Sequence, residues 1–487
     1  MAAMVTVAVI AVVGSFRDRL LQFVPDDAFY YFEIARRISL GQGSTFDGIN
    51  YTNGYHPFWL VVLSLTSLLR LTREAEVRLA MVLGVIMLGA AVFFLRAVAG
   101  KLVQSDRWVA LLLPASALSF ATIYGLESQL AALLFAVLLW QVARSETAPG
   151  VGRGAIVGMI AGGLVLARLD SALYVIALDL IWIVRLWRRR GQEDSRLSFR
   201  GWLACLVAQV AVVTPYLAFN LCFFRHVLPI SAVIKSERSG WLNLSWAGSL
   251  LAMLSVAGLG AGLIAGWLGL RRPMKMVWQT ALVGSGLTLV LNLVAGGKES
   301  YSWYFTLPVM CTGLFVCVLV SNLKASGIRS TVLGGLVMGC GLIVLASSFS
   351  ARLSPPKFAP RMDRAHWIAA NAPAQAVFAE GNCGILGHFS QRPFINLDGL
   401  ANSFSYEQSI RDDRVADWLR AAGFNAVALP ANTALEPLAD GSYRMRLVVS
   451  GVTRRTIRLA LRRWDEGERG APGSYIVWRV ISIEDGA

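Results

Sequence analysis

Residues 201–223 read GWLACLVAQVAVVTPYLAFNLCF, an uncharged apolar run. As a helix, a run of this length crosses the ~30 Å hydrocarbon core of a bilayer. Comparable runs recur along the first 350 residues, at 1–16, 79–98, 108–124, 129–143, 154–167, 171–184, 201–223, 246–268, 276–295, 303–321 and 330–349. The pattern predicts a polytopic α-helical membrane protein with about eleven transmembrane helices.

The composition of the whole chain agrees with this interpretation. Of 487 residues, 56% are hydrophobic and 15% are charged, whereas a soluble protein carries about 25% charged residues. These values exclude an ordinary cytosolic enzyme, a disordered protein and a disulfide scaffold. The net charge of +15 comes largely from short loops between apolar runs, which is typical of membrane topology and argues against nucleic-acid binding. Five of the six cysteines lie in apolar runs, so no disulfide framework or metal cluster is predicted.

The loop charges also predict the orientation. Residues 57–69 are apolar but shorter than the ~17–25 residues of a span, so we interpret them as an interfacial helix. Eleven spans with the amino terminus inside then place the arginine-rich loop 185–200 in the cytoplasm, as the positive-inside bias requires. The carboxyl-terminal tail is therefore expected outside the cell (inner) membrane. Residues 1–16 lack a charged leader and a small-residue cleavage site, which predicts a retained helix.

Two regions outside the spans are expected to be ordered. Residues 17–75 form an outer loop, and within it residues 27–40 read as a helix that begins at acidic side chains and ends at Gly41. From residue 351 to 487 the composition is mixed and charged, which predicts a soluble extracytoplasmic α/β domain following a transmembrane domain of residues 1–350. Its expected strands are 376–379, 394–396, 426–429 and 475–483, and its expected helices are 362–371 and 414–422.

Polar residues at the predicted outer face are the candidates for chemistry, because ionisable groups near lipid are costly and mark a site or a water-filled cavity. They are Asp26, Asp27, Asn53, His56, Glu127, Arg168, Asp170 and Lys235. Structural interpretations stay open for most of them. The Asp pair suits a helix cap, His56 suits a turn before Pro57, and Arg168 and Lys235 suit headgroup contacts. The aromatic residues nearby, Tyr304 among them, suit an interfacial belt.

At this point the residues carry a resemblance. The segments DDAFYYFEIARR (26–37), GQGSTFDGIN (41–50) and TNGYHPFW (52–59) resemble the first outer loop of GT-C glycosyltransferases, membrane enzymes that use polyprenyl-phosphate sugars. The acidic pair resembles the protein mannosyltransferase and aminoarabinose transferase group. GLES (125–128) is similar to a segment of actinobacterial arabinofuranosyltransferases, and GILG (384–387) and NLDG (396–399) resemble the outer domain of bacterial relatives.

The resemblance implies an inverting glycosyltransferase that moves a hexose or pentose from a polyprenyl-phosphate donor to an envelope glycan, lipid or protein at the outer leaflet. It implies Asp26 as the catalytic base, assisted by Asp27. Lys235, Arg168 and His56 are then expected to hold the donor phosphate, with Glu127, Asp170 and Asn53 orienting sugar or acceptor hydroxyls. If the enzyme uses a divalent cation, Mg²⁺ or Mn²⁺, Asp26 and Asp27 are its expected ligands, and no other cofactor is expected.

Two other functions remain open. A secondary transporter or lipid flippase needs polar groups at mid-membrane and broken helices, for which only Asp179, Pro215 and Pro308 are suggestive. A non-catalytic envelope assembly factor needs no cluster of carboxylates and cations at the outer face.

Overall fold

We describe the protein from a computed structural model. The structure describes residues 9–10, 12–102, 125–144, 150–188, 194–237, 250–267, 275–295, 301–325, 358–430, 433–450, 453–464 and 475–485. The predicted spans 108–124 and 330–349, most of the span 1–16 and the predicted domain boundary at residue 350 lie outside these residues.

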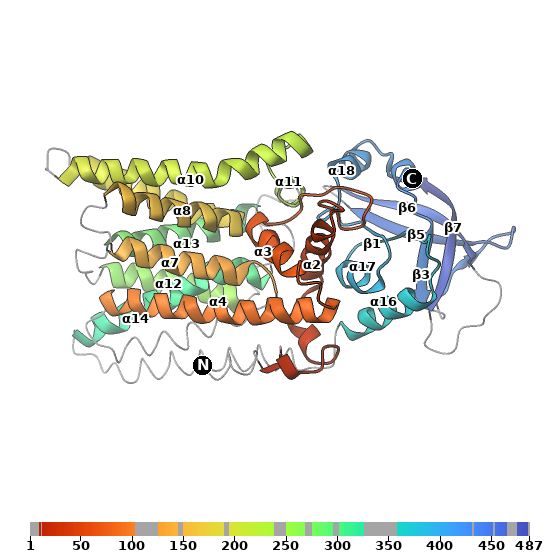
Figure 1. The fold of residues 1–487 in the computed structure, drawn as a ribbon, viewed down its shortest axis with the longest axis horizontal. Helices are drawn as coiled ribbons and strands as arrows, with labels where there is room; N and C mark the ends of the chain where they lie inside the picture. Colours follow the sequence, from red (N-terminus) through yellow and green to blue (C-terminus); the bar gives the residue numbers. More distant parts are fainter. Residues whose placement is uncertain are drawn as a thin grey trace.

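Long helices lie side by side and form one half of the molecule (Figure 1). The described ones are α4 (Arg73–Leu102), α7 (Ser128–Arg144), α8 (Val151–Ala167), α9 (Ala172–Arg188), α10 (Asp194–Phe224), α12 (Leu250–Trp267), α13 (Lys275–Ala295) and α14 (Thr306–Ala325). Each coincides with one of the apolar runs. Within the described ranges, α4, α10 and α13 each include a segment that is long and apolar enough to cross a membrane. The count of eleven spans stays a prediction.

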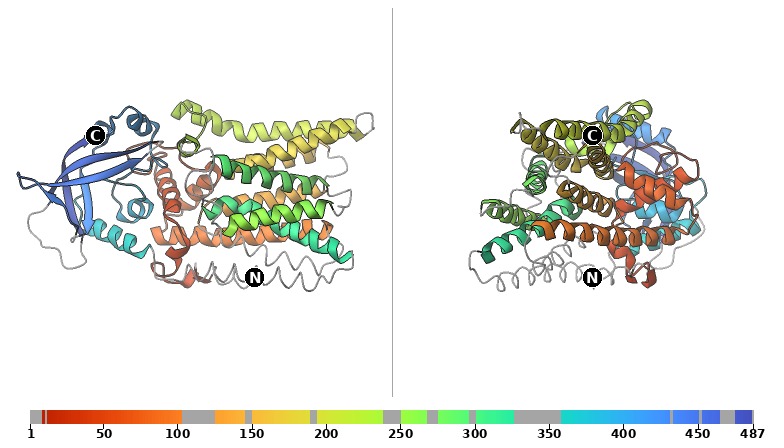
Figure 2. Two further views of the ribbon diagram at one scale, coloured as in Figure 1. Left: turned by 180° about the vertical axis from the view of Figure 1, so that it is seen from behind. Right: turned by 60° about the vertical axis from the view of Figure 1, so that its left-hand side comes forward.

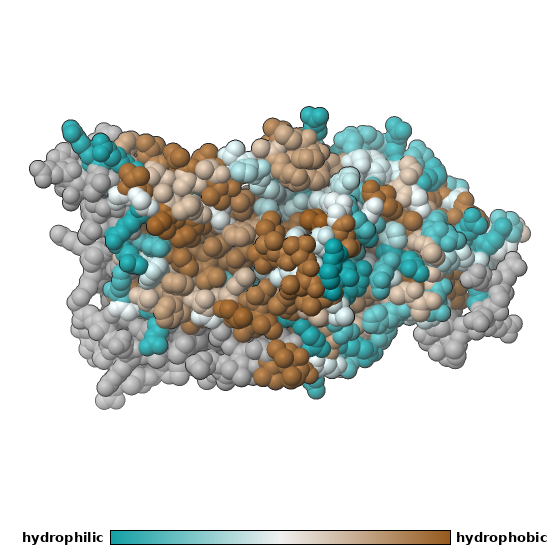
Figure 3. All heavy atoms as spheres, in the orientation of Figure 1, coloured by the Kyte–Doolittle hydropathy of each residue, from teal (hydrophilic) through white to brown (hydrophobic). Residues whose placement is uncertain are grey.

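The outer surface of this helical half is apolar. Leu203, Val207 and Val210 on α10 and Trp267 on α12 are exposed, and Figure 3 shows a hydrophobic band over the middle of the helices with hydrophilic residues towards both ends of the molecule. A soluble protein would cover such a band, whereas a bilayer solvates it. The surface therefore agrees with a membrane protein.

Small residues bring two of the helices together. A Cβ placed on Gly154 or Gly158 of α8 would lie 1.9 Å from the carbonyl oxygen of Gly201 or 2.1 Å from that of Cys205, both on α10. Gly162, one turn further along, meets Val212 in the same way. Glycines at a spacing of four residues allow this close backbone approach, as is common between membrane helices.

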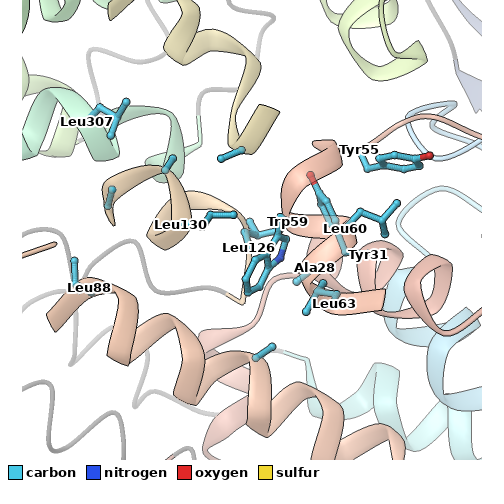
Figure 4. Close-up of a cluster of buried hydrophobic side chains, with 14 of the residues drawn as sticks. Ala28, Tyr31, Tyr55, Trp59, Leu60, Leu63, Leu88, Leu126, Leu130 and Leu307 are labelled. Atoms are coloured by element: carbon cyan, nitrogen blue, oxygen red, sulfur yellow. The ribbon is translucent and has the colours of Figure 1, made fainter. Parts of the chain in front are cut away.

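Two helices of the outer loop lie at the junction with the carboxyl-terminal half: α2 (Asp26–Ser39) and α3 (Pro57–Ser67). The helix predicted at 27–40 is thus confirmed. Trp59 of α3 is buried and donates a hydrogen bond from Nε1 to the carbonyl oxygen of Gly125 at 3.2 Å. Tyr31 of α2 lies beside Trp59, next to Leu126 (Figure 4). This packing fixes both outer-loop helices against the start of α7.

The carboxyl-terminal half contains a mixed sheet in the order β2-β1-β3-β7-β6-β5-β4. The pairings of β1 with β2 and β3 are parallel, and the others are antiparallel. The strands are β1 (Phe378–Glu380), β2 (Phe394–Asn396), β3 (Ala426–Pro430), β4 (Glu436–Pro437), β5 (Tyr443–Ser450), β6 (Arg454–Arg463) and β7 (Tyr475–Asp485), and the helices are α16 (Ala359–Asn371), α17 (Gly384–Ser390), α18 (Phe404–Arg411) and α19 (Val415–Ala421). The four predicted strands and two predicted helices are confirmed, while β4, β5, β6, α17 and α18 were not predicted.

The two halves share one hydrophobic core. Phe29 and Phe32 of α2 pack with Phe389 and His388 of α17, and the two views in Figure 2 show the outer loop between the bundle and the sheet. The carboxyl-terminal half is therefore packed onto the outer loop rather than tethered to it.

A buried ionic cluster strengthens this joint. The carboxylate of Glu33 on α2 is 3% exposed and forms ion pairs with Arg73 and with Arg37, the latter at 3.2 Å. It also forms a hydrogen bond with His388 Nδ1 at 3.2 Å. Burial alone would raise the pKa of Glu33, but the hydrogen bond to His388 and the charges of the two arginines lower it to about 2. Glu33 is therefore a charged, fully partnered connection between α2, α4 and α17.

Candidate functional site

The acidic pair at the start of α2 divides into one partly exposed and one buried carboxylate. Neighbouring residues on a helix point about 100° apart, so Asp26 and Asp27 face different surroundings. Asp27 is partly exposed. Its pKa is raised to about 6, mainly because the carboxylate has lost hydration, with Asp26, Asp398 and Glu127 adding to the effect and Lys235 opposing it. A carboxylate that titrates near 6 is well matched to accepting a proton near neutral pH.

Asp26 is 6% exposed and its carboxylate is already occupied. Oδ2 accepts a hydrogen bond from the amide of Gly384 at 2.7 Å, and Oδ1 accepts one from the amide of Ile385 at 3.1 Å. Arg361 of α16 lies 3.3 Å from Oδ1. Burial raises the pKa of Asp26, and these three partners oppose that rise. Asp26 therefore caps α17 from another part of the chain, while Pro25 holds the capping position of α2 itself.

The remaining carboxylates surround Arg168, which joins α8 to α9. Its Nε and Nη2 donate to both oxygens of Asp170 at 2.8 and 2.9 Å, and its Nη1 donates to Glu127 at 3.2 Å. Such a fork-shaped pairing is strong and directional. Because Arg168 is 3% exposed and paired with two carboxylates, its main role in this structure is to fix them in place.

His56 completes this chain of contacts. Its Nδ1 accepts a hydrogen bond from the amide of Leu169 at 3.3 Å, and its Nε2 lies 3.6 Å from Glu127 Oε1. The amide contact assigns the proton of the neutral imidazole to Nε2, facing Glu127. Burial lowers the pKa of His56, and Glu127 only partly offsets this. A neutral His56 links the backbone at Leu169 to the carboxylate of Glu127, and it carries no charge with which to bind a phosphate.

Lys235 is the exposed cation of the cluster. It lies on α11 (Ile230–Glu237), and its Nζ is 5.5 Å from the ring centre of Tyr304. The guanidinium of Arg168 is 5.4 Å from the same ring. Among the described residues, no carboxylate lies within ion-pair distance of Lys235. Loss of hydration would lower the pKa of Lys235, but Tyr304, Asp27 and Glu127 outweigh it, so the pKa is raised. Lys235 is charged and available to an anion.

Asn53 supports the helix that carries Lys235. It is fully buried, its Oδ1 accepts a hydrogen bond from the amide of Ile230 at 2.9 Å, and its Nδ2 donates to Asn220 at 3.2 Å. The amide of Ile230 is one of the unsatisfied donors at the start of α11. Asn53 therefore positions the helix that carries Lys235, where the sequence had suggested contact with substrate.

A small cavity of about 10 Å³ lies beside this cluster. It is lined by Arg168, Asp170, Tyr174, Thr288, Tyr304 and Pro308. Tyr304 was interpreted from the sequence as part of an aromatic belt, and nothing in its local sequence distinguishes it from its aromatic neighbours. Its position between two cations is a property of the fold.

The structure thus gathers Asp27, His56, Glu127, Arg168, Asp170 and Lys235 in one region, and puts Asp26 and Asn53 in supporting positions. The functional roles predicted for them remain predictions.

The acidic pair is a poor match to a divalent cation. Arg361 lies beside Asp26, and Lys235 acts on Asp27, so positive charge is already supplied by side chains. Within the described residues, no group of three or more His, Cys, Asp or Glu is arranged to hold a metal ion. The expected role of Asp26 and Asp27 as ligands of Mg²⁺ or Mn²⁺ stays a prediction.

Comparison with known proteins shows similarity of fold. No family model and no characterised protein matches the sequence. Solved structures do match, among them ArnT from Cupriavidus metallidurans bound to undecaprenyl phosphate, with a TM-score of 0.55 and 14% identity over 98% of this chain and 96% of that chain. The same ArnT in the apo state matches with a TM-score of 0.54 and 14% identity over 98% of this chain and 97% of that chain. The resemblance expected from the first outer loop is thus confirmed for the fold: the protein has the fold of ArnT.

Proposed function

We propose that the protein transfers a sugar from a polyprenyl-phosphate donor to a hydroxyl group of an envelope glycan, lipid or protein. The observation that carries the proposal is a partly exposed Asp27, whose pKa is raised to about 6, within electrostatic influence of Lys235, an exposed cation whose Nζ lies 5.5 Å from the ring centre of Tyr304. The shared fold with ArnT, solved with undecaprenyl phosphate, supports this class of donor.

The chemistry follows from these two groups. Lys235 binds the donor phosphate and stabilises the negative charge that develops on it as the bond to the sugar breaks. Asp27 accepts the proton of the acceptor hydroxyl while the acceptor oxygen forms a bond to the anomeric carbon. The lipid phosphate leaves with the electrons of the broken carbon–oxygen bond. A single displacement of this kind inverts the configuration of the sugar.

The contacts favour Asp27 over Asp26 as the base. Asp26 is 6% exposed, accepts two backbone hydrogen bonds and pairs with Arg361, so it is less accessible to an acceptor hydroxyl than Asp27 is. Asp27 is more exposed and lies within the electrostatic influence of Lys235. In this proposal four side chains hold one another in place beside the reacting groups through their ion pairs and hydrogen bonds: Arg168, Glu127, Asp170 and His56.

The positive-inside bias of the loop charges supports a proposed site at the outer leaflet of the cell (inner) membrane, with the carboxyl-terminal half outside. There the helix ends around the site are reachable by a lipid donor from the bilayer and by an envelope acceptor from the aqueous side.

The test is a transfer assay with purified full-length protein. A panel of polyprenyl-phosphate sugars is incubated with extracted envelope glycans and lipids, and the products are identified by mass spectrometry. Transfer of one sugar, with release of the lipid phosphate and an inverted anomeric centre, is the expected result. Transport of a lipid-linked sugar across proteoliposomes without any transfer would favour a flippase and contradict the proposal.

A further inference from the structure

One face of the carboxyl-terminal sheet is covered by arginines. Successive residues of a strand point to opposite faces of a sheet. On β6, Ile457, Leu459 and Leu461 are buried in one cluster with residues of α18 and α19, so the residues between them point to the other face. The exposed arginines on that other face of β5, β6 and β7 are called the arginine face here: Arg444, Arg446, Arg454, Arg458, Arg462 and Arg479.

Two pairs of these arginines lie directly opposite each other on neighbouring strands. Arg446 of β5 is in register with Arg458 of β6, and Arg462 of β6 is in register with Arg479 of β7. Directly opposed side chains have Cβ atoms about 4.5–5.5 Å apart, and like charges in that arrangement destabilise a sheet. The fold thus maintains two repulsive pairs, and the stability of the sheet does not explain why they are there.

The carboxylates of the protein balance only part of this charge. Arg444 forms an ion pair with Glu436 at 3.1 Å. In the part of the chain that the structure describes, no carboxylate lies within ion-pair distance of Arg446, Arg458 or Arg462. The described carboxylates near the arginine face are Glu436, Asp440, which lies in the turn before β5, and Glu484, which is opposite Arg458. The arginine face therefore carries an excess of positive charge.

Protection of a sheet edge does not account for these arginines either. Charged side chains on an edge strand commonly prevent it from pairing with another chain. However, β6 lies between β5 and β7, so Arg458 and Arg462 are on an interior strand. Their position in the middle of an exposed face suits the binding of a negatively charged ligand.

The spacing of the arginines indicates what kind of anion fits. A guanidinium binds a carboxylate or a phosphate through two parallel hydrogen bonds, and such a group placed between two facing arginines offsets their repulsion. Arg458 and Arg462 belong to different facing pairs and are four residues apart on β6, which is ~13 Å along a strand. One small anion cannot bridge that distance, whereas a polymer with repeated negative charges can occupy both pairs at once.

The place of the sheet in the molecule favours a polymer over a lipid surface. The strands β5, β6 and β7 lie at the end of the molecule away from the helical bundle, with the outer loop in between (Figures 1 and 2). The headgroups of a bilayer around the bundle are therefore separated from the arginine face, whereas a polymer in the aqueous phase can reach it.

We propose that the arginine face binds an envelope glycan that carries carboxylate or phosphate groups. The two facing pairs, Arg446 with Arg458 and Arg462 with Arg479, are the expected contacts for successive anionic groups of the glycan. This inference goes beyond the proposed function and does not depend on it, because binding is measured without any transfer.

The test measures binding of acidic polymers to the full-length protein in nanodiscs of phosphatidylcholine, a lipid without net charge. The probes are polygalacturonate, which carries carboxylates, and a poly(glycerol phosphate), with dextran as the uncharged reference. The wild type is expected to bind at least one acidic polymer and not dextran. The double variant Arg446→Gln with Arg458→Gln should weaken that binding about 10- to 100-fold, because charge-assisted hydrogen bonds are lost.

Two further variants serve as controls. Arg196→Gln with Arg200→Gln removes the same charge from two exposed arginines near the start of α10, in the loop predicted to be cytoplasmic, and should bind the polymers as the wild type does. Arg446→Lys with Arg458→Lys keeps the charge but loses the fork-shaped hydrogen bonding, so its affinity should be intermediate. The melting temperature of the glutamine variant should be unchanged or higher, because two facing like charges are removed.

Weaker binding without a lower melting temperature identifies a binding surface, since arginines with a structural role would lower both. No binding of either acidic polymer by the wild type, or equal affinities in the wild type and the glutamine variant at Arg446 and Arg458, would overturn the inference. So would equal losses in the two glutamine variants, or a lower melting temperature in both the glutamine and the lysine variants of the arginine face. Binding of phosphatidylglycerol vesicles but of neither polymer would assign the arginine face to lipid headgroups and contradict the proposal.

Discussion

The carboxylate of Asp26 accepts a hydrogen bond at 2.7 Å from the backbone amide of Gly384, 358 positions further along the chain. A Cβ on Gly384 would lie 2.1 Å from the carbonyl oxygen of Asp26, so only glycine allows this approach. The contact connects the start of α2 to the start of α17. It fixes the first turn of the helix on which Asp27 is presented.

The two aspartates are therefore expected to respond differently to the same change. Asp27→Asn should lower the transfer rate about 10²- to 10⁴-fold, because the base is lost, and should leave the fold intact. Asp26→Asn replaces an acceptor of two amide hydrogen bonds and should lower the free energy of unfolding by about 1–3 kcal/mol. Transfer rate and melting temperature, measured for both variants, separate the roles. A stable but inactive Asp26→Asn beside an active Asp27→Asn would reverse the assignment.

The pH dependence should report Asp27. With a pKa raised to about 6, the base is protonated below that value, so kcat/KM should fall about tenfold per pH unit as the pH drops below 6. Stability should change in the opposite direction. A raised pKa means that the folded state binds the proton of Asp27 more tightly than the unfolded state does. Protonated Asp27 therefore adds to the free energy of unfolding below pH 4, and this gain is lost as the pH rises through 6. Melting curves of wild type and Asp27→Asn between pH 4 and 8 should converge at the acidic end.

Lys235 should control affinity for the donor phosphate. Lys235→Gln is expected to weaken binding of undecaprenyl phosphate by about tenfold or more, since a charge-assisted contact is lost, while Lys235→Arg should retain most of it. Arg411→Gln is a suitable control, because Arg411 is exposed and pairs with Glu237 on the same helix as Lys235. Binding measured by fluorescence titration should be unchanged in that control. Equal affinity in wild type and Lys235→Gln would exclude Lys235 from the phosphate site.

The buried cluster around Glu33 should make the stability of the protein sensitive to acid. Glu33→Gln leaves Arg73 and His388 without their carboxylate and should cost about 3–5 kcal/mol in the free energy of unfolding. Because the pKa of Glu33 is lowered to about 2, its contribution is present above the unfolded value near 4.5 and is lost as the pH falls towards 2. Thermal melts of the wild type should therefore decline below pH 4.5, with a smaller decline in Glu33→Gln. An unchanged melting temperature of that variant at pH 7 would contradict the prediction.

The contact between α8 and α10 should tolerate no side chain at its centre. Gly158→Ala places a methyl group against the carbonyl of Cys205 and should destabilise the bundle by about 1–3 kcal/mol. Gly152→Ala in the same helix is the control, because a Cβ there meets nothing within 4 Å, and it should be neutral or stabilising. The melting temperatures in detergent compare the two directly.

Much of the fold could be predicted because it depends on local signals. Apolar runs marked α4, α7 to α10 and α12 to α14, and the acidic start with Gly41 at the end marked α2. The strands β5 and β6 were missed because exposed arginines such as Arg446 and Arg458 alternate with their core residues and make the segments read as polar. α17 was missed because it is a short helix whose N-terminal amides are satisfied by Asp26, far away in the sequence.

Only part of the candidate site could be predicted from the sequence. The charged residues around Arg168 and Lys235 could be found, since charge at the end of an apolar run is conspicuous. Which of two adjacent aspartates is exposed could not, because α16 and α17 decide it through Arg361 and Gly384. The NLDG segment was noticed as a similarity, but its place beside Gly54 and Ile234 depends on the packing of three separate elements.

Because the start of α2 binds the start of α17, the order of synthesis determines when α2 can reach its final contacts. During synthesis, residues 26 to 39 leave the ribosome more than 300 residues before residue 384 does. Throughout that interval Asp26 lacks the amides of Gly384 and Ile385 that it binds in the finished protein. A nascent chain that ends before residue 384 therefore still lacks the contacts that order the start of α2, and the candidate site is complete only after the last quarter of the chain has folded onto the outer loop.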